Sequence, residues 1–156
     1  MNFFKKYYQD IANCVQRLDE RKINLIYKMI KDTSKKGGII YIAGNGGSAS
    51  TSSHMSTDLT KNAKIKSMSF NDTNLITCFA NDYGYENWLK AAIKYYVKPN
   101  DLVVLLSVSG KSKNLVNAAN FCKKKKIKFI TMTGAKKNNP LSQKGIINYW
   151  IDSKAY

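Results

Sequence analysis

IIYIAGNGGSAS, residues 39–50, is the stretch of sequence that decides the fold. Its first five residues form a short, continuous apolar run, which is typical of a strand buried on both faces. Glycine-rich residues follow at once, and a helix is predicted after them over about 49–61. LVVLLSV, residues 102–108, is followed in the same way by a predicted helix over about 112–125. This alternation indicates a parallel sheet covered by helices on both faces.

The remaining segments extend the same alternation. Three further strands are predicted at 65–70, 128–134 and 146–151, and two further helices at about 73–80 and 85–97. Two N-terminal helices, over 3–19 and from there up to Gly37, fall outside the alternation, and we expect them to pack against a partner subunit. The predicted organisation is an N-terminal helical oligomerisation segment at 1–36 and one α/β domain at 37–156.

The bulk composition excludes several classes of protein. At 156 residues the chain suits one domain with a real core. It has no run near the roughly 20 apolar residues that a membrane helix needs, and polar residues interrupt its N-terminal segment, so neither a membrane span nor a signal peptide is predicted. The three cysteines, Cys14, Cys78 and Cys122, lack CxxC spacing, and we expect them to be reduced core residues of a cytoplasmic protein.

The formal net charge of +16 raises the question of nucleic-acid binding. Of the 26 basic residues, 24 are lysines and two are arginines, Arg17 and Arg21, whereas surfaces that read bases or clamp phosphates favour arginine. The densest cluster, Lys123–Lys126, is expected in the last turn of a helix, where cations complement the helix dipole. A solvated basic surface is therefore favoured over a nucleic-acid interface, although the charge can attract an anionic substrate.

Two polar segments follow predicted strands at the carboxyl edge of the sheet, where ligands bind in parallel α/β folds. In Gly44–Ser50, glycines allow close backbone approach, and the next helix offers free N–H groups to an anion. The alternative is a tight connection only. In SVSGKS, residues 107–112, three hydroxyls and a glycine can form a phosphate cradle. The alternative is that Ser112 only caps the following helix.

Further candidate ligands lie outside these two segments. Asn81 and Asp82, between the two middle helices, can bind sugar hydroxyls or can form a simple turn before Gly84. His54, the single histidine, and Asp58 share one face of the predicted 49–61 helix at i, i+4 spacing. Such a pair can ligate a metal or move a proton, and the alternative is a structural hydrogen bond.

The chain resembles the sugar isomerase (SIS) domain, and within it the phosphoheptose isomerase branch. Three motifs carry the resemblance and follow one another in the order of the family: GNGGSASTSSHMSTDL (44–59), ANDYGYE (80–86) and SVSGKS (107–112). The similarity covers about residues 1–152. It implies a three-layer αβα sandwich with a five-stranded parallel sheet, a homotetramer, and active sites shared between subunits. It also implies conversion of sedoheptulose 7-phosphate to D-glycero-D-manno-heptose 7-phosphate through an enediol, in lipopolysaccharide or capsule biosynthesis.

The resemblance also implies roles for individual residues. The positions that match substrate contacts are Asn45, Gly46, Gly47, Ser48, Asn81, Asp82, Ser107, Val108, Ser109 and Ser112. His54 matches a zinc ligand, and Asp58 stands where the family has a glutamate that binds zinc and acts as acid or base. We therefore expect one zinc ion per subunit, a substrate-contacting base at Asp58, and a phosphate anchored by the loop at 107–112.

Two departures from the family pattern concern the catalytic set. Asp58 is one methylene shorter than glutamate, which withdraws its carboxylate by about 1.5 Å. The family also has a last helix with a glutamine zinc ligand and a catalytic histidine, which has no counterpart up to Tyr156, and we expect a truncated chain. His54 and Asp58 give two of the about four ligands that zinc takes. The alternative function is a non-catalytic SIS module that binds or senses a sugar phosphate, such as a replication-initiator-binding relative.

Overall fold

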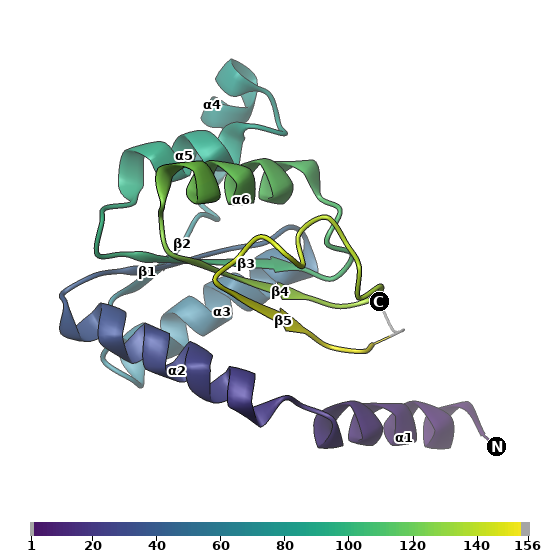
Figure 1. The fold of residues 1–156 in the computed structure, drawn as a ribbon. Helices are drawn as coiled ribbons and strands as arrows, with labels where there is room; N and C mark the ends of the chain where they lie inside the picture. Colours follow the sequence, from purple (N-terminus) through teal and green to yellow (C-terminus); the bar gives the residue numbers. More distant parts are fainter. Residues whose placement is uncertain (1, 154–156) are drawn as a thin grey trace.

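Five short parallel strands form one sheet at the centre of the computed structural model, which describes residues 2–153 (Figure 1). The strands are β1 (Ile40–Ala43), β2 (Ser67–Ser69), β3 (Leu102–Ser107), β4 (Phe129–Thr133) and β5 (Ile147–Trp150). Their order in the sheet is β2-β1-β3-β4-β5, and every neighbouring pair is parallel. The predicted five-stranded α/β fold is confirmed. The predicted end of the domain at residue 156 lies outside the described residues.

Helices cover both faces of this sheet (Figure 1). They are α1 (Phe3–Gln16), α2 (Glu20–Lys35), α3 (Gly47–Lys61), α4 (Thr73–Tyr83), α5 (Trp88–Tyr96) and α6 (Lys113–Lys125). The hydrophobic cluster on one face includes side chains of α2 and α3, and the cluster on the other face includes side chains of α4, α5 and α6. The result is the predicted three-layer sandwich.

The alternation of side chains along β1 explains why its sequence is continuously apolar. Ile40 and Ile42 belong to the cluster beneath α2 and α3, whereas Tyr41 and Ala43 belong to the cluster beneath α5 and α6. All four residues are buried. Because successive side chains of a strand point to opposite faces, a strand covered on both sides needs an apolar residue at every position.

The two N-terminal helices differ from each other in how they pack. Ile26 and Ile30 of α2 are buried in the cluster against the sheet, so α2 is part of the sandwich and does not fall outside it as the sequence suggested. By contrast, α1 has no buried residue, and in Figure 1 it extends to one side of the body. Within the described part of the chain, α1 therefore contributes no side chain to the two hydrophobic clusters.

The structure also corrects two expectations about single residues. Asn81 and Asp82 lie in the last turn of α4, which ends at Tyr83, rather than in a loop between helices. Only Cys122 is a buried core cysteine, because Cys78 is exposed and Cys14 is partly exposed. Burial raises the pKa of the Cys122 thiol to about 12. The expectation that all three cysteines are core residues was wrong, because Cys14 and Cys78 lie on helix faces that are open to solvent.

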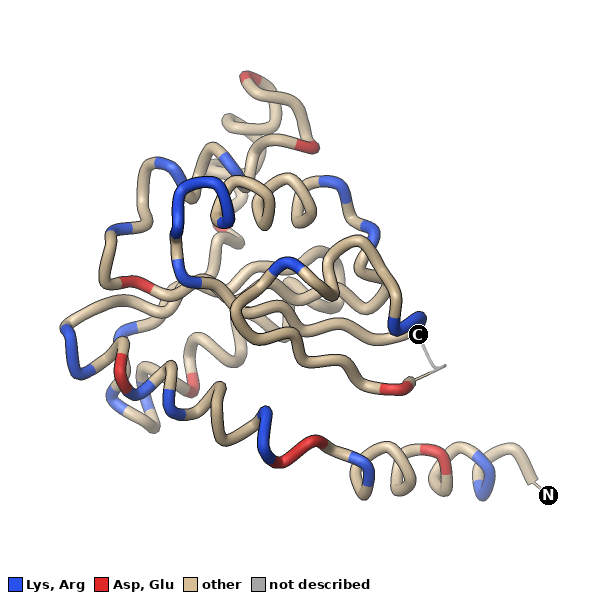
Figure 2. Tube along the Cα trace, viewed as in Figure 1, with Lys and Arg blue, Asp and Glu red and all other residues tan. Residues whose placement is uncertain are grey.

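The lysine cluster lies where its sequence predicted. Lys123, Lys124 and Lys125 form the last turn of α6, and Lys126 ends the helix in a left-handed conformation. Figure 2 shows this cluster as a continuous basic stretch at one end of α6. No helix among residues 2–153 is long and apolar enough to cross a membrane.

The central strands should carry most of the stability, and one pair of matched substitutions tests this. Ile42 is fully buried in β1, whereas Ile146, just before β5, is 60% exposed. We expect Ile42→Ala to lower the free energy of unfolding by about 2–5 kcal/mol, because it leaves a cavity between sheet and helices. Ile146→Ala should cost less than about 0.5 kcal/mol. Urea denaturation measures both, and equal losses would contradict the burial described above.

Candidate functional site

The order of the strands creates a crevice at the carboxyl edge of the sheet. From β1 the chain crosses to β2 on one side, and later returns to β3 on the other side of β1. Connections therefore leave β1 and β3 in opposite directions, which is the switch point at which open α/β sheets bind ligands. The loops that follow these two strands, Gly44–Gly46 and Val108–Ser112, flank this point.

The glycine loop after β1 presents an open helix N-terminus. Gly46 is the N-cap of α3, with a φ of 52° and no side-chain cap bond. A Cβ atom added at Gly46 or Gly47 would meet nothing within 4 Å, so the backbone there is open to a ligand. The first turn of α3 contains no acidic residue. The partial positive charge of this helix end is therefore left for an external anion.

The serine loop after β3 has hydroxyls that turn toward one another. The buried Ser107 Oγ accepts a hydrogen bond from the Gly110 N–H at 3.1 Å and lies 3.5 Å from Ser112 Oγ. Ser112 occupies the N-cap position of α6, but its side chain makes no cap bond. The capping alternative therefore does not account for its hydroxyl. Ser109 Oγ accepts a bond from the Lys111 N–H at 3.3 Å.

Asn45 links all three polar segments. Its Nδ2 donates to Asn114 Oδ1 at 2.9 Å, and Asn114 Nδ2 donates back to Asn45 Oδ1, also at 2.9 Å. The Tyr85 hydroxyl lies 3.5 Å from Asn45 Oδ1. Asn114 follows the serine loop and Tyr85 belongs to the segment at 80–86, so contacts across 69 and 40 residues converge on one amide. Sequence patterns did not single out Asn114, and they did not show that Tyr85 of the 80–86 motif reaches Asn45, because both contacts are long-range.

A cavity of about 730 Å³ lies between α1 and this edge of the sheet. It contains three of the predicted substrate-contacting residues, Ser48, Ser107 and Val108. Its other polar and charged lining residues come from α1 and the residue after it, from α3, from β4, and from the last described residues. They are Lys6, Tyr7, Asp10, Asn13, Arg17, Thr51, Thr133, Asp152 and Ser153. Sequence patterns did not single out Lys6 or Arg17, because nothing local in α1 shows that it faces a cavity.

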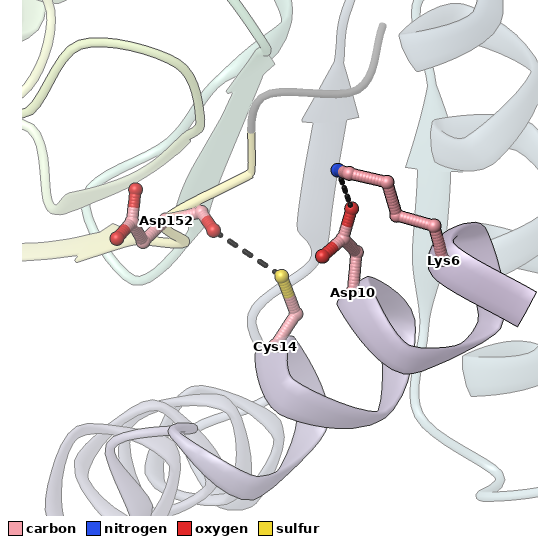
Figure 3. A network of polar contacts seen from close by, with 4 residues as sticks. All are labelled: Lys6, Asp10, Cys14 and Asp152. Carbon is pink, nitrogen blue, oxygen red and sulfur yellow. Dashed lines mark hydrogen bonds and ion pairs between the residues drawn. The ribbon is translucent and has the colours of Figure 1, made fainter. Parts of the chain in front are cut away.

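Contacts with the last described residues place α1 over the cavity. Figure 3 shows the Cys14 Sγ donating to the backbone oxygen of Asp152, at 3.2 Å, and the Lys6 Nζ bound to Asp10 Oδ2 at 3.1 Å. The Lys6–Asp10 pair is well exposed, so it contributes little to stability. The Cys14–Asp152 bond joins α1 to the last described residues, whereas the Lys6–Asp10 pair lies within the helix and leaves Lys6 available to an anion entering the cavity.

His54 and Asp58 lie on a neighbouring surface rather than in this cavity. The His54 Nε2 is 3.3 Å from Asp58 Oδ2, and the side chains are 82% and 52% exposed. They line a shallow hollow along α3, and Thr51 lines both this hollow and the cavity. Among residues 2–153 no three His, Cys, Asp or Glu side chains are grouped so that they can hold a metal ion. The described residues therefore do not fit a complete zinc site.

Asn81 and Asp82 lie away from the cavity. Both are exposed in the last turn of α4, and the Asn81 Nδ2 donates to Asp82 Oδ1 at 3.0 Å. Neither residue lines the cavity or contacts Asn45. The structure thus brings together the glycine loop, the serine loop and Tyr85. It leaves His54 and Asp58 on a neighbouring surface of α3, and Asn81 and Asp82 exposed on α4.

Fold and site together define a doubly wound α/β ligand-binding domain with two open helix N-termini at its switch point. A family model described as the SIS domain matches residues 4–134, and the chain belongs to this family. Among its relatives, a phosphoheptose isomerase of Akkermansia muciniphila is 34% identical over 118 residues, which make up 72% of this chain and 62% of the relative. The resemblance seen in the sequence is confirmed. The chain spans less than two thirds of that relative's length.

Solved structures show the same fold. A phosphoheptose isomerase from Francisella tularensis superposes with a TM-score of 0.86 at 19% identity, covering 98% of this chain and 84% of the other. The sugar isomerase domain of an RpiR transcription factor from Sphaerobacter thermophilus superposes with a TM-score of 0.68 at 13% identity, covering 97% and 74%. The fold thus occurs in an enzyme and in a transcription factor.

The serine loop should depend on the absence of a side chain at Gly110. Its φ is 64°, and an added Cβ would overlap the amide of the buried Asn139. We expect Gly110→Ala to lower the free energy of unfolding by roughly 1–3 kcal/mol, because alanine is strained in this conformation. Gly47→Ala, where a Cβ meets nothing, is the matched control and should leave thermal unfolding unchanged. Equal stability of the two variants would contradict the prediction, because it would show that the loop accommodates a side chain at position 110 without loss of stability.

Proposed function

We propose that this chain acts as a phosphoheptose isomerase on sedoheptulose 7-phosphate. The observation that carries the proposal is the convergence of two open helix N-termini and the serine hydroxyls at one switch point, joined through Asn45. The similarity to phosphoheptose isomerases supports the choice of substrate. The product would be D-glycero-D-manno-heptose 7-phosphate, which serves lipopolysaccharide or capsule biosynthesis.

In the proposed mechanism the phosphate binds first. The first turn of α6 and the hydroxyls of Ser109 and Ser112 donate hydrogen bonds to the phosphate oxygens, and Lys6 and Arg17 add positive potential in the adjoining cavity. Anchoring the phosphate fixes the orientation of the sugar chain, which lowers the entropic part of the barrier. The glycine loop then offers Asn45 and backbone N–H groups to the hydroxyl or carbonyl oxygens of the sugar.

Isomerisation moves one proton between neighbouring carbons. Asp58 accepts the proton from C1 of the ketose, the released electron pair forms the C1–C2 double bond, and the C2 oxygen takes a proton from water to give the enediol. Asp58 then returns its proton to C2, and the C1 hydroxyl proton passes to water, which forms the aldose. His54, 3.3 Å from the Asp58 carboxylate, would hold that carboxylate in place.

We further propose that a second copy of the chain covers α1 and completes the site, in a homotetramer. The supporting observation is the exposed apolar surface of α1, which carries Phe3, Phe4, Tyr7, Tyr8, Ile11 and Val15. Contiguous exposed apolar surface of this kind is typical of protein interfaces. A shared site would also bury Asp58, which is half exposed within one chain. The three free cysteines suit the reducing cytoplasm.

The second candidate is a non-catalytic module that binds a sugar phosphate. It is favoured by one observation, namely that the described residues supply only His54 and Asp58 as metal or proton-transfer groups on α3. Both candidates use the same loops, so binding alone does not separate them. Turnover does.

Binding and turnover should respond differently to two substitutions. We expect Ser109→Ala to weaken sedoheptulose 7-phosphate binding about 10- to 100-fold, because a hydrogen bond to a charged phosphate is lost. Asp58→Asn should abolish isomerisation while changing affinity little, because it removes the base. Calorimetry and a coupled isomerase assay measure these effects.

Ser34→Ala, near the end of α2, is the matched control for the serine substitution. Wild-type binding without turnover would leave the non-catalytic module standing. If the wild-type chain did not bind the sugar phosphate, both candidates would be overturned.

Zinc binding stays a prediction that needs ligands beyond the described residues. Because His54 and Asp58 are the two candidate ligands that lie together, we expect Zn²⁺ to bind this chain with a dissociation constant above about 1 μM. This binding is far weaker than that of a complete four-ligand site. Competition against a fluorescent chelator measures this, and His54→Ala should remove the binding. Nanomolar affinity would show that further ligands complete the site.

A further inference from the structure

Asn114 is a buried polar side chain whose contacts lead to the glycine loop. It lies in the first turn of α6 and is only 1% exposed, next to Leu115 and near Ala118 in the apolar layer. A buried amide costs free energy unless its donors and acceptor are bonded. Two hydrogen bonds, at 2.9 Å each, join its amide to the side chain of Asn45. The amide of Asn114 is therefore directed at one residue of the other loop.

The reciprocal pair fixes how Asn45 can bind a ligand. Asn45 Oδ1 is used as acceptor by Asn114 Nδ2, with the Tyr85 hydroxyl at 3.5 Å, and one N–H of Asn45 Nδ2 is used by Asn114 Oδ1. An amide nitrogen has two N–H donors. One donor of Asn45 thus remains for a ligand. A flip of the Asn45 amide alone would break both bonds to Asn114, whereas a joint flip of both amides would restore them and turn the Asn45 nitrogen toward the Tyr85 hydroxyl. The pair with Asn114 therefore fixes the position of the Asn45 amide, and the Tyr85 hydroxyl, which donates to Asn45 Oδ1, favours the orientation with the nitrogen free for a ligand.

Another contact shows why this pair matters for the loop. Asn71 Nδ2 donates to the Ala49 carbonyl oxygen at 2.6 Å and to Ser53 Oγ at 2.7 Å, which holds the first turns of α3 beside β2. Asn45 lies before this held segment, and Gly46 and Gly47 have no side chains to pack. Among the described residues, the bonds from Asn114 are the shortest side-chain contacts that hold Asn45.

We propose that Asn114 is a positioning residue, which holds the Asn45 amide in place and thereby couples the glycine loop to the phosphate-binding serine loop. This inference rests on the proposed function for its ligand, a sugar phosphate. Since Asn114 follows the N-cap Ser112 by two residues, a phosphate that orders the start of α6 also orders the partner of Asn45. The two ends of the substrate are then bound with a coupling free energy rather than independently.

Two substitutions and a double-mutant cycle test the proposal. Asn114→Leu keeps the approximate volume and removes both amide bonds, and Asn114→Ala removes the side chain. We expect each variant to bind sedoheptulose 7-phosphate about tenfold more weakly, and turnover, where the wild type shows it, to fall as well. Because Asn114 acts through Asn45, the double variant Asn45→Ala/Asn114→Leu should bind no more weakly than Asn45→Ala alone. Additive losses in this cycle would overturn the proposal.

Hydrogen exchange provides a readout that does not need the ligand. Amides of residues 44–48 should exchange at least tenfold faster in Asn114→Leu than in the wild type, with β3 and β4 amides unchanged. Asn120→Ala, at an exposed position on the same helix whose side chain accepts a hydrogen bond from Lys144, is the matched control and should change neither exchange nor binding.

The outcomes separate the two hypotheses. If the wild type does not bind the sugar phosphate but residues 44–48 loosen in Asn114→Leu, the proposed function fails and the positioning role stands. If exchange of residues 44–48 is unchanged, or if protection is lost equally throughout the sheet, Asn114 has only a packing role and the inference is overturned. Asn114→Ala gives the same comparison should Asn114→Leu not fold.

Discussion

The parallel pairing of β1 with β3 is the constraint on which the rest of the structure depends. The register places Ile40 beside Leu102 and Ala43 beside Leu105, so both strands end at the same edge. The buried Asp101 carboxylate supports this pairing at the other edge, because it accepts from the N–H groups of Ile39 at 2.8 Å and Lys98 at 2.6 Å. With the two strands aligned, the loops that leave them, and the helices that follow, must start side by side.

The same constraint separates charge across the molecule. In a parallel α/β sheet every connecting helix starts at the carboxyl edge and ends at the amino edge. The last turns of α2, α3, α5 and α6 each contain at least one lysine, whereas the first turns of α3, α5 and α6 contain no acidic residue. Lysines thus compensate the C-termini of these helices, as the basic stretch of α6 in Figure 2 illustrates. The N-termini of α3 and α6 carry no side-chain cap bond, in contrast to those of α2 and α4, which Asp19 and Asp72 cap. The two helix ends at the switch point are therefore the ones left for an external anion.

What the sequence could predict follows from the range of each interaction. The strands at 39–43 and 102–108 were predictable because burial on both faces demands a local apolar run. The glycine and serine loops were predictable because they follow those strands directly. The contacts of Asn114 and Tyr85 with Asn45 were not, because each forms only after the chain has folded, across 69 and 40 residues. The burial of α2 was missed for the same reason, since its partner strands come later in the chain. Local patterns therefore revealed the two loops and not the contact that joins them.

The geometry of α3 limits which ligands can use the whole site. The helix begins at the glycine loop, and its rise of 1.5 Å per residue places His54 about 9 Å beyond Ser48 along the axis, with Asp58 a further turn away. A compact anion such as phosphate can engage only the loops. A ligand that is held by the serine loop and still reaches Asp58 must be elongated and must lie along the exposed face of α3, passing Thr51, which borders both hollows. An extended sugar phosphate meets this requirement, and a cover over that face would come from outside residues 2–153, since His54 and Asp58 stand exposed among them.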